Sequence, residues 1–102
     1  MKYQLVLQFP GEAMMDLESL VSLEDRLAEE LEEFAEVDGH DIGSGEMNIF
    51  ILTDNPKKAF EMSRSVILET SLSGSIRAAY REVTGSTFTI LWPTTLKEFV
   101  VK

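Results

Sequence analysis

The chain has 102 residues, a length typical of one domain, and we expect residues 1–102 to fold as a single unit. Its composition is 44% hydrophobic and 26% charged, which excludes a globally disordered chain. There is no cysteine, which excludes disulfides, thiolate nucleophiles and cysteine-ligated metals. Because a signal-peptide pattern and a long apolar run are also absent, the sequence predicts a cytoplasmic protein that does not enter a membrane.

The formal net charge of −9 is spread unevenly along the chain. Residues 12–46 contain 13 of the 18 acidic residues and only one arginine or lysine, Arg26. A field of this sign repels phosphate backbones, so we expect no nucleic-acid partner and favour a basic protein as partner. The alternative is a charged face that only keeps the protein soluble.

The first two predicted elements are a strand and an amphipathic helix. Residues 2–9 alternate apolar and polar side chains, which predicts a strand with one buried face, ended by Pro10. Residues 14–36 repeat apolar side chains every three or four positions, which predicts a helix capped by Asp16, with a later start at Ser22 as the alternative. The predicted apolar stripe consists of Leu17, Leu20, Leu23, Leu27, Leu31 and Phe34.

A β-hairpin and a second helix are predicted next. Residues 46–53 are apolar on both faces, as in a central strand, and Ser44-Gly45 suits a tight turn that pairs them with residues 37–43. Asn55 caps the second helix, which Ser73-Gly74 ends. Its predicted packed face consists of Ala59, Phe60, Met62, Ser63, Val66 and Ile67.

Two strands at 76–83 and 87–92 complete the order β-α-β-β-α-β-β, and residues 94–102 follow as a tail. This order predicts an α+β fold, a ferredoxin-like βαββαβ sandwich with an additional C-terminal strand and both helices on one face of an antiparallel sheet. If the other face is open, Val6 is exposed there, and an apolar open face predicts a homodimer or another partner.

Candidate ligand-binding residues gather around the only histidine. In a regular strand Asp38 and His40 point to one side and Asp41 to the other, while Glu46 lies across the turn. A carboxylate beside an imidazole can prepare a general base, and these groups also bind divalent ions. The alternative is that they serve only the hairpin. We assign no catalytic residue, metal or cofactor, because one histidine without cysteine makes no structural zinc site.

Acidic residues near the C-terminal end of the first predicted helix form a second candidate site. The helix dipole disfavours negative charge there, so helix stability does not explain them. The predicted partner-binding residues are Glu29, Glu32, Glu33 and Glu36, with Asp38 beside them.

Three strings of the sequence resemble short bacterial proteins without an assigned activity: GHDIGSGEMNIF at 39–50, T-D-x-P at 53–56 and AYRE…LWP at 79–93. The resemblance covers about half the chain and implies a ferredoxin-like domain. In size and acidity alone the chain is similar to toxin-immunity proteins. Neither resemblance carries a functional residue over.

Three functions follow as hypotheses. The first is a non-enzymatic interaction module, immunity- or inhibitor-like, that binds a basic protein. The second is a small-molecule- or metal-binding domain, enzymatic or not, at the Asp38–Glu46 hairpin. The third is an oligomerising, ligand-sensing regulatory domain. Fold alone does not choose between them.

Overall fold

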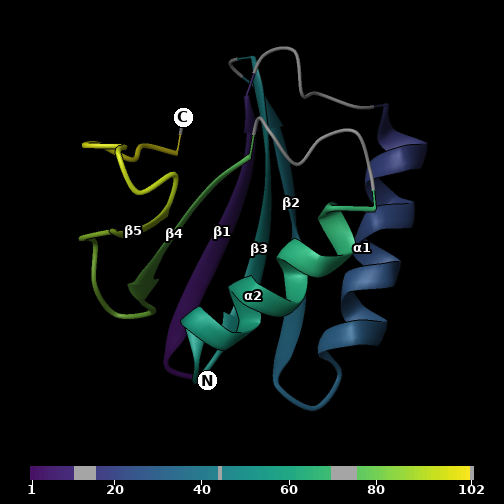
Figure 1. The fold of residues 1–102 in the computed structure, drawn as a ribbon, viewed down its shortest axis with the longest axis horizontal. Coiled ribbons are helices and arrows are strands. Elements are labelled where there is room, and N and C mark those ends of the chain that lie inside the picture. Colours follow the sequence, from purple (N-terminus) through teal and green to yellow (C-terminus); the bar gives the residue numbers. More distant parts are fainter. Residues whose placement is uncertain (11–15, 44, 70–75, 102) are drawn as a thin grey trace.

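The computed structural model describes residues 1–10, 16–43, 45–69 and 76–101 (Figure 1). Its strands are β1 (Tyr3–Pro10), β2 (Ala35–Gly43), β3 (Glu46–Thr53), β4 (Arg77–Glu82) and β5 (Thr89–Trp92). Its helices are α1 (Leu17–Leu31) and α2 (Pro56–Ile67). Neither of these two helices is long and apolar enough to cross a membrane.

The five strands form one antiparallel sheet in the order β2-β3-β1-β4-β5. Each helix crosses over between strands that are not neighbours, which is the split βαβ arrangement of a ferredoxin-like sandwich. In Figure 1, α1 lies beside β2 at one end of the sheet, and β5 lies at the opposite end with the tail of residues 93–101. The predicted fold, with its additional C-terminal strand, is confirmed.

Helix α1 begins at the predicted cap. The backbone N–H of Ser19 donates to Oδ1 of Asp16 at 2.8 Å, which satisfies one of the free donors of the first turn. Hydrogen bonds from Ser19, chiefly from its backbone N–H, lower the pKa of Asp16. The helix therefore starts at the first of the two predicted positions, Asp16, and not at Ser22.

The apolar stripe of α1 is shorter than predicted. The helix ends at Leu31 instead of residue 36, and residues 14–15 lie outside the described part of the chain. The buried residues of the helix are Leu20, Leu23, Leu27 and Leu31. Leu17 is 57% exposed because it lies at the margin of the stripe, in the first turn. Phe34 is 38% exposed because the chain has already left the helix, and its ring lies under Lys58, with Nζ 4.0 Å from the ring centroid.

The hairpin and α2 follow the prediction with two changes. Strand β2 starts at Ala35 instead of residue 37 and contains a bulge between Val37 and Gly39, whose φ of 134° suits glycine. Of the predicted turn, Gly45 has a φ of 78°, and residue 44 lies outside the described residues. The N-cap of α2 is confirmed, because Asn55 Oδ1 accepts the Lys58 N–H at 3.2 Å.

Helix α2 ends at Ile67, with Leu68 at the C-cap, so it is shorter than the predicted helix that ends at Ser73-Gly74, and those two residues lie outside the described part of the chain. Within the helix, the predicted face is buried except for Met62, which is partly exposed. These residues join α1 and one face of the sheet in the main core. Its largest members on the sheet are Leu5, Leu7, Phe9, Ile49 and Ile51.

The second face of the sheet is covered at Val6, so the expectation that this residue is exposed is wrong. Val6 and Ala79 are fully buried, and Phe99 from the tail packs against them with 9% of its surface exposed. Five partly buried residues surround them: Phe50, Phe88, Ile90, Leu96 and Val101. The tail covers this face because its apolar side chains and those of the sheet leave water together. A homodimer stays a prediction, but an exposed Val6 does not support it.

Candidate functional site

The largest group of exposed charges lies on α1, the turn after it and β2. We define the acidic surface as eight exposed carboxylates: Asp25, Glu29, Glu30, Glu32, Glu33, Glu36, Asp38 and Asp41. Figure 1 shows α1 and β2 side by side at one end of the sheet. Within the described residues, no side chain of these eight takes part in an ion pair or hydrogen bond. The acidic surface includes all four predicted partner-binding residues.

The carboxylates in the C-terminal half of α1 lower the stability of this helix. Asp25 and Glu29 are four residues apart on the outer side of the helix, where like charges repel. The last turn contains no basic residue, and Glu32 occupies the C-cap. Negative charge near the negative end of a helix dipole lowers helix stability by roughly a few tenths of a kcal/mol per residue.

His40 has a carboxylate partner that the sequence analysis did not name. Its Nδ1 lies 2.7 Å from Oε1 of Glu24, which projects from α1 toward β2. The two side chains are 30% and 13% exposed. Such a contact fixes the ring orientation and ties β2 to α1. Glu24 could have been found from its position, because it lies beside the apolar stripe, one turn after Leu20.

The other predicted hairpin residues do not gather around His40. Asp41 pairs with Asn48 in the β2–β3 register and lies on the opposite face, as expected from strand alternation. Asp38 sits within the bulge, where that alternation is interrupted. Glu46 also lies on the face opposite His40. Among the residues that the structure describes, no three histidine or acidic side chains are grouped so as to hold a metal ion.

Glu46 instead belongs to a buried polar group on the second face of the sheet. Gln8, Asn48 and Glu46 are only 1%, 1% and 5% exposed. The side-chain N–H groups of Gln8 donate to Glu46 Oε1 at 3.2 Å, Asn48 Oδ1 at 3.1 Å and the Val100 carbonyl at 2.9 Å. The arrangement connects β1, β3 and the tail, and it supplies the partners that buried polar groups require.

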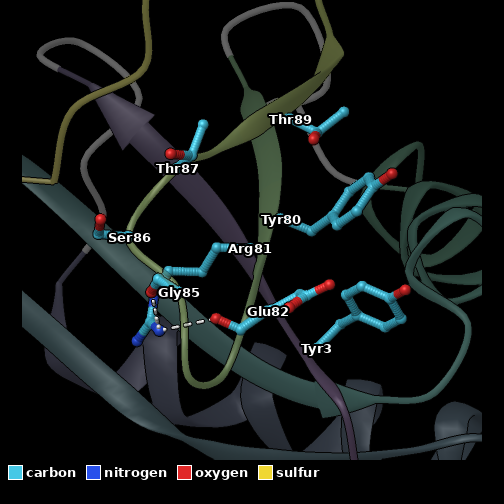
Figure 2. A pocket seen from close by; sticks show the side chains of 8 residues that line it. All are labelled: Tyr3, Tyr80, Arg81, Glu82, Gly85, Ser86, Thr87 and Thr89. Atoms are coloured by element: carbon cyan, nitrogen blue, oxygen red, sulfur yellow. Dashed lines mark hydrogen bonds between the residues drawn. The ribbon is translucent and has the colours of Figure 1, made fainter.

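A surface hollow of about 470 Å³ lies at the end of β4 (Figure 2). Figure 2 shows Tyr3, Tyr80 and Glu82 projecting to one side of the sheet and Arg81 to the other. The two tyrosine rings pack edge to face, with centroids 5.6 Å apart and planes at 89°. This geometry is favourable for an aromatic pair and stabilises β1 against β4.

Arg81 fixes the loop between β4 and β5. Its Nη1 donates to three backbone carbonyls, those of Glu82, Val83 and Gly85, at 3.1, 2.9 and 3.0 Å. Two of these bonds are visible in Figure 2. A guanidinium satisfies several loop carbonyls at once because its donors form a rigid planar fork.

Comparisons of the chain with protein-family models, with curated proteins and with solved structures give no match. The function of the protein is therefore inferred from geometry and charge. Of the features above, the acidic surface has the most unpaired charge, whereas the polar groups at His40, Glu46 and Arg81 have partners within the fold.

Proposed function

We propose that this protein is a non-catalytic interaction module that binds a positively charged surface of another protein through the acidic surface. One observation carries the proposal. Eight exposed carboxylates lie around one edge of the sheet, on α1, the following turn and the edge strand β2, and within the described residues none has a charged or hydrogen-bonded partner for its side chain.

Charge complementarity gives such a surface a function. Opposite charge on a partner accelerates encounter and fixes the orientation of the complex, and like charge on other proteins rejects them. The carboxylates at the end of α1 repel one another in the free protein. Lysine and arginine side chains of a partner offset that repulsion in the complex. Binding is therefore favoured because it relieves a repulsion that the free protein retains.

The test compares two double variants of identical net charge. Glu29→Lys with Glu33→Lys reverses two charges of the acidic surface. Glu61→Lys with Glu98→Lys reverses two exposed charges on α2 and the tail. Each immobilised variant and the wild type capture proteins from an extract of the source cell at low and moderate salt, and the captured proteins are identified by mass spectrometry.

We expect a basic protein to be retained by the wild type and by the Glu61/Glu98 variant, and lost by the Glu29/Glu33 variant. The affinity of this basic protein for the wild type, measured with both proteins purified, should fall as the salt concentration rises, because the ion pairs between them are exposed and are screened by salt. The proposal fails if both double variants retain or lose the basic protein to the same extent, because the position of the charges on the acidic surface then makes no difference to binding.

A further inference from the structure

We propose that the protein also binds a carboxylate attached to an apolar group, in a hollow on the second face of the sheet beside Arg81. The hollow has a volume of about 580 Å³, within the range of roughly 300–1,000 Å³ typical of small-molecule sites. Its lining comes from β1, β3, β4, the loop after β4 and the tail: Gln4, Phe50, Arg81, Gly85, Ser86, Phe88 and Val101.

The apolar part of the hollow is the exposed border of the second core. Phe50, Phe88 and Val101 pack against the cluster of Val6, Ala79 and Phe99 but are only partly buried themselves. The Phe88 ring lies 5.0 Å from the Phe99 ring, centroid to centroid. These side chains are held from behind by the core, so they offer a preformed apolar wall to a ligand.

The polar part of the hollow favours an anion. None of its seven lining residues is acidic, although the chain contains 18 acidic residues. Arg81 uses Nη1 on the loop carbonyls, while Nε and Nη2 have no hydrogen bond within the described residues. Figure 2 shows this second terminal nitrogen directed away from the loop. The side chains of Gln4 and Ser86 likewise have no hydrogen-bond partner among the described residues.

These features together select the ligand class. The loop carbonyls hold the guanidinium in place, and its remaining N–H groups match the two oxygens of a carboxylate. The aromatic wall accommodates an apolar body attached to that carboxylate. Of the acidic surface, Glu36 shares this face, but β3 and β1 separate it from Arg81. Because neighbouring strands are about 4.8 Å apart, its charge lies farther from Arg81 than the screening length of about 10 Å at about 0.1 M salt.

The experiment titrates ¹⁵N-labelled protein with 3-phenylpropionate and, as a neutral analogue, with 3-phenylpropionamide. For so small a ligand in an open hollow, saturation is expected at roughly millimolar concentration. We expect saturable amide shifts at Phe50, Ser86, Phe88 and Val101. The neutral amide should bind about tenfold more weakly or worse, because it loses a charge-assisted hydrogen bond.

A substitution at Gln4 tests the site without removing the loop contacts of Arg81. Gln4 and Arg81 are cross-strand partners on the same face. Gln4→Glu therefore places a carboxylate beside the free guanidinium donors, where it competes with the ligand and should weaken binding at least about tenfold. Ser65→Glu, on the exposed side of α2, adds the same charge far from the hollow and should leave binding unchanged.

The carboxylate and its apolar group can belong to a free small acid or to the C-terminal residue of a peptide chain. A third titration with an acetylated tripeptide that ends in phenylalanine distinguishes them, and tighter binding of either supports the proposal. It is overturned if the acid and the amide bind equally, if Gln4→Glu binds as the wild type does, or if no saturable shift appears at these residues. None of these results depends on the acidic surface.

Discussion

Charged side chains at the two ends of the sheet differ in whether they have partners within the fold. At the α1–β2 end, eight exposed carboxylates form no side-chain hydrogen bond or ion pair within the described residues. Toward the β4–β5 end, the arginines are engaged. Arg64 stacks on Trp92, 4.2 Å from the ring centroid, Arg81 binds three loop carbonyls, and Arg77 donates to Gln8 at 3.5 Å.

This difference separates charges that serve the fold from charges that do not. A guanidinium packed on a ring or bonded to carbonyls contributes to stability, and removing it loosens the structure. A carboxylate that repels its neighbours and has no partner lowers stability, so replacing it should stabilise the protein. Stability measurements on variants at each end therefore test this difference directly.

The largest effect is expected at the tail. Phe99→Ala should lower the free energy of unfolding by about 3 kcal/mol, because the substitution removes a large ring that is buried against Val6 and Ala79. Denaturant unfolding followed by circular dichroism measures this change. Val100→Ala is the control, since that residue is half exposed and should change stability by less than about 0.5 kcal/mol. Equal effects of the two variants would show that the tail is not part of the core.

A single charge reversal should act with opposite sign in the two helices. Glu29→Lys should stabilise the protein by about 0.5–1 kcal/mol, because it replaces repulsion from Asp25 with attraction and complements the helix dipole. Glu61→Lys should destabilise it by a similar or smaller amount, because Glu61 lies among Lys57, Lys58 and Arg64 on α2. Thermal unfolding at roughly 0.02 M and 0.5 M salt measures both, and salt should shrink both effects. A destabilising Glu29→Lys would contradict the interpretation of the acidic surface.

The contact between Glu24 and His40 should contribute modestly to stability. A double-mutant cycle with Glu24→Gln and His40→Gln is expected to give a coupling energy of about 0.5 kcal/mol, because the pair is partly exposed and screened. A coupling near zero would mean that β2 is held to α1 by apolar contacts alone.

The smallest effect concerns the N-cap of α1. The pKa of Asp16 is lowered in the folded protein, so the ionised cap stabilises the fold above its unfolded pKa. That contribution is lost as pH falls below about 4 and through the lowered pKa. Asp16→Ala should therefore lower the melting temperature at neutral pH, and the difference from the wild type should become smaller in acid, where only the uncharged capping oxygen remains. Asp16→Asn retains a capping oxygen but has no charge at residue 16. The stability of Asp16→Asn relative to Asp16→Ala should therefore not change over the pH range in which residue 16 titrates in the wild type.

Local patterns made most of the fold predictable. The order of the elements, the caps at Asp16 and Asn55 and the central strand at 46–53 follow from periodicity and short-range hydrogen bonding, which depend on neighbours in sequence. The acidic surface was predictable for the same reason, since charge density and the direction of a helix dipole can be read along the chain. Only the structure shows that these carboxylates are exposed and that, among the described residues, their side chains have no hydrogen-bond or ion-pair partner.

Patterns along the chain are enough to predict a ferredoxin-like order of elements and an acidic first half. The tertiary structure decided what depends on contacts between distant segments: Phe99 over Val6, Glu24 beside His40, and Glu46 bonded to Gln8 on the face opposite His40. No local pattern contains these pairings, because an irregular tail has no periodicity and one bulge changes which side chains of a strand share a face.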